Sequence, residues 1–250
     1  MITVLLVSQP LGLVLVVGVA LVAGGAGLSG AQFAAAAGGG VAGAFALGCF
    51  FRAMAIGPVS IVAPISSLGA IVPVAVGLAR GEQPGALQIA GLLVALAGIA
   101  MAVREAEHPH GMDVPTRSVV LAALAGAGFG TFFVGLDAAA SSNAYWAAAA
   151  GRFGGSAAVA GASLILPFQL ALPRTALPAL ATIAVLDTLA NVLFALATRE
   201  GLLALVAVAG SLYPVTTVLL ARFVLGERLV AVQRAGVILA LTGAVLIAAG

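Results

Sequence analysis

Two ionisable residues lie deep inside long apolar stretches of the sequence, where a charged side chain is costly. Asp187 lies in the middle of the stretch 176–198, and Asn191 follows four residues later on the same helical face. A carboxylate that lines a cavity at this depth can bind a cationic substrate or exchange a proton. The alternative is a structural role as the partner of Arg152 or of a neighbouring helix, and the sequence leaves both interpretations open.

Arg152 is the second of these residues, and it is the ninth residue of the stretch 144–170. An arginine or aspartate at the centre of a membrane helix costs about 2.5–3.5 kcal/mol on insertion scales, so such a residue usually has a function or a partner. The guanidinium can bind a substrate carboxylate, or it can hold neighbouring helices together. We predict Asp187, Asn191 and Arg152 as candidate substrate-binding residues.

Prolines interrupt two further apolar stretches, 58–79 and 201–222. The first contains Pro58, Pro64 and Pro73, and the second contains Pro214. Each proline removes a backbone donor and predicts a kink or break, which transporters tolerate where the backbone lines a cavity. Hydroxyl groups beside these breaks can bind a substrate, but they can equally join helices by hydrogen bonds. The candidate residues of this kind are Ser66, Ser67, Ser211 and Tyr213.

The composition requires that these stretches be membrane helices. Hydrophobic residues make up 63% of the 250 positions and charged residues only 7%, with a mean hydropathy of +1.25, whereas a soluble domain carries roughly 25% charged residues. The apolar stretches show no period-two alternation, so they predict helices rather than barrel strands. The net charge of +2 and the scattered arginines, with no lysine, exclude a nucleic-acid-binding surface.

Charges, prolines and glycine clusters predict nine membrane helices and one polar linker, which begins at Arg104. The linker holds His108 and His110, and we predict a solvated loop rather than a metal site because no third ligand lies nearby. We expect no metal, no cofactor and no enzyme active site, since both histidines lie outside the predicted helices. The predicted helices are 3–24, 32–53, 58–79, 86–103, 118–137, 144–170, 176–198, 201–222 and 229–249.

The sequence contains an internal repeat. Residues 81–98 and 226–243 are identical at nine of 18 positions at a constant offset of 145, and the shared residues include a Gly-Glu pair and a Gln. Glu82 and its counterpart Glu227 lie in short loops, and we predict that each caps the helix that follows it. Gly91 and its counterpart Gly236 are small enough for close helix packing.

The repeat divides the chain into a first copy (1–104), a polar linker (105–117) and a second copy (118–250). The helix at 144–170 aligns with the first helix of the chain, so the first copy has four predicted helices and the second has five. The missing helix indicates either that Met1 is a miscalled start or that the protein is a nine-helix variant. An odd number of helices per complete copy makes the two copies antiparallel, an arrangement common in secondary transporters.

The second copy resembles the EamA domain of the drug/metabolite transporter superfamily. The resemblance rests on Tyr213-Pro214-Val, then Leu225-Gly226-Glu227-Arg228, then Gln233-Arg-Ala-Gly236. The first copy is similar through Pro73-Val74, Gly81-Glu82 and Gln88-Ile-Ala-Gly91. The resemblance covers essentially the whole chain as two copies, and it implies a polytopic all-α bundle of two inverted repeats with five helices each, one helix more than this chain has.

The resemblance also implies a function, that of a secondary active transporter in the plasma membrane. Such a protein exports small, amino-acid-like metabolites or amphiphilic compounds by alternating access; a lipid-carrier flippase and a non-transporting membrane subunit are the alternatives. The sequence has no G-x-x-x-x-G-K-[ST] motif, so we expect the energy to come from a gradient or from a partner protein. We expect a small-molecule substrate, with protons as candidate coupling ions through Asp187, and a monomer in the lipid bilayer because one chain holds both copies.

Overall fold

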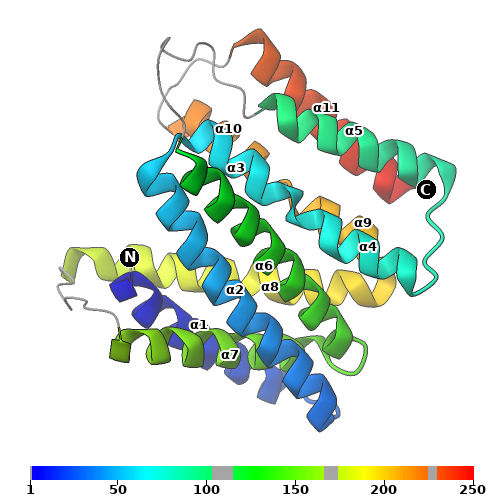
Figure 1. Ribbon diagram of the computed structural model, residues 1–250. Coiled ribbons are helices and arrows are strands. Elements are labelled where there is room, and N and C mark those ends of the chain that lie inside the picture. Colours follow the sequence, from blue (N-terminus) through cyan, green and yellow to red (C-terminus); the bar gives the residue numbers. More distant parts are fainter. Residues whose placement is uncertain (1, 103–114, 166–173, 225–229) are drawn as a thin grey trace. The chain divides into compact units, whose positions relative to one another are not determined.

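The computed structural model describes residues 2–102, 115–165, 174–224 and 230–250, and all regular structure in these ranges is helical (Figure 1). The first predicted copy contributes α1 (Ile2–Ala23), α2 (Gly30–Ile56), α3 (Val59–Ser67), the 3-10 turn η1 (Leu68–Ala70), α4 (Ile71–Ala79) and α5 (Ala86–Ala102). The second contributes α6 (Thr116–Ala140), α7 (Ala144–Ile165), η2 (Arg174–Ala176), α8 (Leu177–Glu200), α9 (Leu203–Gly210), α10 (Tyr213–Val224) and α11 (Ala231–Ala249).

Every one of the nine predicted helices has a counterpart among these elements, two of them as broken helices. Within the described residues, six helices are long and apolar enough to cross a membrane, while α5 and the segment Leu203–Thr216 are apolar but shorter. The prediction of an all-α polytopic membrane protein is therefore confirmed. The two histidines of the linker and Glu227 lie outside the described residues, so the predictions for them stay predictions.

Pro73 and Pro214 each lie beside a break, whereas Pro64 lies inside α3 without one. Pro73 has no N–H to donate to the carbonyl of Gly69, four residues earlier, and the chain passes through η1 at Leu68–Ala70 before α4 begins. Pro214 likewise cannot donate to Gly210, which is the last residue of α9. Each predicted helix is consequently divided into two shorter helices, α3 with α4 and α9 with α10.

The two breaks fall at the same place in the repeat. Ser67 precedes η1 and Ser211 follows α9, and these serines are related by the offset of 144 residues found in the sequence. Leu68 and Leu212, the next residues, are related by the same offset. The irregular backbone is thus a feature of both copies.

Two compact units make up the chain, and each contains helices from both predicted copies. Unit 1 comprises Met1–Leu47 and Thr131–Gly201, and unit 2 comprises Gly48–Gly130 and Leu202–Gly250. The units are defined by contacts in space, whereas the predicted copies are defined by sequence similarity. The boundaries of the copies stay a prediction.

In unit 2 the equivalent helices α5 and α11 pack side by side and run in opposite directions (Figure 1). Residue numbers rise along one helix as they fall along the other at every close approach, so the pair is antiparallel. Each contact has an equivalent one: if every residue is replaced by its counterpart 145 positions away in the other copy, one contact becomes another contact of the same pair of helices. This is the inverted relationship predicted from the sequence. The paired residues are Gly91 with Ile247, Ala95 with Gly243, Gly98 with Ala240, and Ala102 with Gly236.

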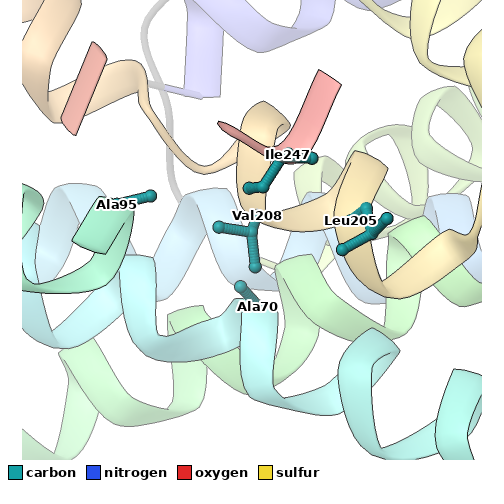
Figure 2. Packing of buried hydrophobic residues seen from close by; sticks show 5 residues of the cluster. All are labelled: Ala70, Ala95, Leu205, Val208 and Ile247. Carbon is teal, nitrogen blue, oxygen red and sulfur yellow. The ribbon is translucent and has the colours of Figure 1, made fainter. Parts of the chain in front are cut away.

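Small side chains fill the space between the helices of unit 2. Figure 2 shows Val208 of α9 with its side chain between Ala70 of η1 and Ile247 of α11. Ala95 of α5 and Leu205 of α9 complete this buried cluster. Alanine and valine keep the helix backbones close, and Leu205 and Ile247 fill the remaining space, so packing contacts hold these helices together.

Unit 1 is built on the same principle from α1, α7, α8 and parts of α2 and α6. A methyl group at Gly40 of α2 would overlap the backbone of Gly151 in α7, and one at Gly154 of α7 would overlap the backbone of Ala37 in α2. α1 packs against both α7 and α8. These close approaches position the polar side chains described next.

Candidate functional site

The two ionisable residues predicted at membrane depth form an ion pair in unit 1. Arg152 of α7 places Nη2 at 2.8 Å from Oδ2 of Asp187 in α8. The Arg152 side chain is only 4% exposed, whereas that of Asp187 is 49% exposed. The sequence had left a structural partnership between these residues as one interpretation of Asp187, and the structure brings them together.

A third helix, α1, also binds the guanidinium. Arg152 Nη1 donates a hydrogen bond of 2.8 Å to Oε1 of Gln9, which is itself buried. Gly12, one turn further along α1, lies against the guanidinium, because an added Cβ there would be 3.2 Å from Arg152 Cζ. The same Cβ would be 2.8 Å from Oγ1 of Thr188 in α8. Arg152 therefore joins α1, α7 and α8 at one point.

Gln9 was missed by the sequence interpretation, although the sequence held a signal for it. Ser8 and Gln9 form a polar pair in the otherwise apolar stretch 3–24. The repeat offset of 144 places Arg152 on Ser8, next to Gln9, so the two polar positions occupy similar places in the two copies. Asn191 lies one turn beyond Asp187 on α8, and its side chain is partly exposed.

A second polar contact lies at the helix breaks of unit 2. Ser66 Oγ lies 2.6 Å from the Tyr213 hydroxyl and 2.9 Å from the carbonyl oxygen of Ala63. Ser66 has a single proton to donate, and the Ala63 carbonyl can only accept, so Tyr213 is the donor to Ser66. The bond links α3 to α10, and thus the broken helix of one copy to that of the other.

The ring of Tyr213 belongs to an aromatic cluster with Phe50 and Phe129. The ring of Phe50 in α2 meets Tyr213 edge-on at 6.5 Å between centroids, and it meets Phe129 of α6 at 6.1 Å. Ser66 is 1% exposed, while the three rings are partly exposed. The result is one buried hydroxyl pair beside a partly exposed aromatic cluster.

The other predicted residues at the breaks are buried. Ser211 is 3% exposed, and its hydroxyl donates to the carbonyl of Ala207 in its own helix at 2.8 Å. Ser67 is buried as well, and Pro73 and Pro214 are fully buried. The substrate-binding candidates therefore fall into two groups in different units: the Arg152–Asp187 pair in unit 1, and the Ser66–Tyr213 pair with Ser67 and Ser211 in unit 2.

Glu82 caps a helix, but not the one that follows it. Its two carboxylate oxygens accept hydrogen bonds from the backbone N–H groups of Leu203 and Ala204, at 2.8 and 3.0 Å. These are the first two residues of α9, whose positive end attracts a carboxylate. The prediction that Glu82 caps α5 is corrected accordingly, since the loop after α4 directs the side chain to a helix that lies 121 residues away in the sequence.

Gln88 supplies the cap that had been assigned to Glu82, and Gln233 makes the equivalent bond in the second copy. Gln88 Oε1 accepts from the N–H of Gly85 at 2.8 Å, and Gln233 Oε1 accepts from the N–H of Val230 at 3.1 Å. The two bonds are related by the repeat offset of 145 residues. Each begins the last helix of its copy, α5 or α11, which explains why both copies carry Gln at this position.

The fold and these sites define a polytopic helical membrane protein built from inverted repeats. The model of the EamA-like transporter family matches residues 116–249, more than half of the chain, and the chain belongs to this family. It is therefore a membrane transporter and a multi-pass membrane protein.

Comparison with the curated proteins finds no match. Among solved structures, 22 chains match. One is a crystal structure with a TM-score of 0.78 and 16% sequence identity, which covers 98% of this chain and 86% of its own chain. At this identity the likeness shows the fold alone.

Proposed function

We propose that the protein is a secondary active transporter that exports small metabolites, amino-acid-like or amphiphilic, by alternating access. The observation that carries this proposal is the local two-fold relationship of α5 and α11, with a broken helix at the equivalent place of each copy. Alternating access requires two conformations of similar free energy, and two inverted copies of one structure supply them. Broken helices offer backbone groups that a polar solute can bind.

The Arg152–Asp187 pair supports proton coupling as part of this proposal. A half-exposed carboxylate at membrane depth is a candidate site for a proton that is gained and lost during a transport cycle. The sequence has no motif for binding a nucleotide phosphate, which supports a gradient as the driving force over ATP bound by this chain. One charge moved through 100 mV supplies about 2.3 kcal/mol.

A lipid-carrier flippase is the second candidate function. The aromatic cluster beside Tyr213 favours it, because partly exposed rings at membrane depth suit an apolar chain as well as an amphiphilic solute. A non-transporting membrane subunit is the remaining alternative, and it would bind no solute.

Counterflow in proteoliposomes tests the proposal. The purified chain would be reconstituted with a panel of amino acids, nucleosides and cationic amphiphiles, each with and without a pH gradient. We expect counterflow of at least one solute, stimulated by the pH gradient, and no stimulation in Asp187→Asn. Wild-type counterflow that is the same with and without the pH gradient would contradict proton coupling. The absence of counterflow for every solute of the panel, with folded protein, would contradict solute export.

The matched control for Asp187→Asn is Glu200→Gln. Both variants replace a carboxylate of α8 by its amide, but Glu200 is the exposed last residue of the helix. We expect Glu200→Gln to retain pH-stimulated counterflow. If both variants lose pH-stimulated counterflow equally, the effect is due to the charge of α8 in general and not to the Asp187 site.

A further inference from the structure

The Nε–Nη2 edge of the Arg152 guanidinium has no hydrogen-bond acceptor aligned with its N–H groups. Nη1 is satisfied by Gln9, but Nε and Nη2 have no hydrogen-bond partner within the described part of the chain, although both atoms are buried. Asp187 Oδ2 lies 2.8 Å from Nη2, close enough for an ion pair, yet the two groups are not aligned for a hydrogen bond. An arginine that is 96% buried thus keeps two donors unused.

These two donors form the part of an arginine that best fits a carboxylate. The N–H groups on Nε and Nη2 point in the same direction and are spaced to match the two oxygens of a carboxylate in a bidentate pair. Buried donors that lack an acceptor are unfavourable, because they have lost their bonds to water. The arrangement therefore favours any planar oxyanion that can reach this edge.

Asp187 lies at the exposed end of the same site. Its side chain is half exposed, whereas Arg152 is closed off on another side by Gly12 of α1. A solute carboxylate that approaches Nε and Nη2 must therefore take the place of the Asp187 carboxylate. Two carboxylates beside one guanidinium repel each other, and the repulsion is relieved when Asp187 binds a proton.

We propose that the Nε–Nη2 edge of Arg152 binds the carboxylate group of the transported solute, and that Asp187 takes up one proton as the solute binds. The proposal rests on the transport function proposed above, and it names the substrate class as solutes that bear a carboxylate. The step is balanced, since one solute anion and one proton enter together and Asp187 becomes a neutral carboxylic acid. Solute binding is thereby coupled to a proton without any further ionisable group.

Within the described residues, Arg152 is the charged group that pairs with Asp187. α1 has no ionisable side chain in Ile2–Ala23, and the other ionisable residues of α7 and α8 lie at least seven positions along their helices from the pair. These residues are Tyr145 of α7 and Arg199 and Glu200 of α8, and the part of α6 in unit 1 carries Asp137.

Binding measurements on the purified full chain test the proposal independently of transport. Thermal stability in detergent would be titrated with benzoate and acetate, and with the neutral isosteres benzamide and acetamide. We expect both carboxylates to stabilise the wild type, more strongly at mildly acidic than at neutral pH, and both amides to have no effect. Equal stabilisation by benzoate and benzamide would overturn the proposal.

Two variants give opposite changes in carboxylate affinity. Asp187→Asn removes the competing carboxylate, so we expect benzoate to bind about tenfold more tightly and independently of pH. Arg152→Lys keeps the charge but loses the two-donor edge, so we expect benzoate binding to weaken about tenfold. Unchanged affinity in either variant, with Glu200→Gln as the control for folding and charge, would overturn the proposal.

The binding and transport results separate the two proposals. Carboxylate binding with these variant effects but no counterflow would support the site and contradict the transport function. Counterflow of cationic amphiphiles that persists in Arg152→Lys, without carboxylate binding, would support the transport function and contradict the site.

Discussion

Gly91 of α5 and Gly236 of α11 each lie against the backbone of the other's helix, at Ile247 and Ala102 respectively. The two contacts are equivalent, because Gly236 is the counterpart of Gly91 and Ile247 is the counterpart of Ala102 at an offset of 145 residues. The contact explains why the repeat retains glycine at these positions. A side chain on either residue would separate the two helices.

Gly98, one of the most closely packed glycines of this helix pair, gives the first prediction. A Cβ at Gly98 would overlap the backbone of Ala240, so Gly98→Ala should destabilise the protein by about 1–3 kcal/mol. Gly48→Ala in α2 is the control, because a Cβ there has open space. Thermal or denaturant unfolding in detergent would measure both. Equal stability of the two variants would contradict the close packing of α5 on α11.

Gly12 provides a second matched pair of glycines, both in α1. An added Cβ at Gly12 would be 2.8 Å from Thr188 Oγ1 and would press on Arg152, whereas Gly18 has open space. We expect Gly12→Ala to lower the free energy of unfolding by about 1–3 kcal/mol and to reduce counterflow. Gly18→Ala should leave both unchanged. Full activity of Gly12→Ala would show that the position of the guanidinium is not required.

The cap of α9 predicts the effect of removing Glu82. Glu82→Ala leaves the N–H groups of Leu203 and Ala204 without their acceptor and should cost about 0.5–2 kcal/mol of stability. Glu82→Gln should cost less, because an amide oxygen still accepts one bond. The repeat predicts a similar loss for Glu227→Ala. Unfolding curves of the three variants would check this, and a neutral Glu82→Ala would contradict the cap.

A double-mutant cycle distinguishes the two interpretations of the Ser66–Tyr213 pair. If the bond joins helices, then Ser66→Ala, Tyr213→Phe and the double variant should give a coupling energy of about 0.5–1.5 kcal/mol without any solute. If the hydroxyls instead bind the solute, the coupling should appear only when solute is present. Unfolding measurements with and without a solute that shows counterflow would separate these outcomes.

Local sequence features predicted the helices and their breaks. Long apolar stretches identified nine helices because a membrane leaves the backbone no other way to satisfy its hydrogen bonds. Pro73 and Pro214 located the breaks because the missing N–H acts on a residue only four positions away. In each of these cases the cause and its effect lie within one turn of helix.

Contacts between distant segments were harder to predict. Glu82 was assigned to α5, the nearest helix in sequence, whereas its partner Leu203 is distant in sequence and is reached only in the folded protein. Gln9 was overlooked although it is polar in an apolar stretch, because its partner Arg152 is also distant in sequence. The composition of the two units follows from such contacts and has no local signal.

Because each unit draws on both halves of the chain, neither can be completed before residue 201 has been made. Gln9 enters the membrane with the first helix, but Arg152, which its amide oxygen binds, lies 143 residues later in the chain. During that part of synthesis the amide must remain in contact with water, the insertion machinery or another polar group. The order of synthesis therefore requires the early helices to stay loosely held, and α1 reaches its final surroundings only after α7 and α8 have been inserted.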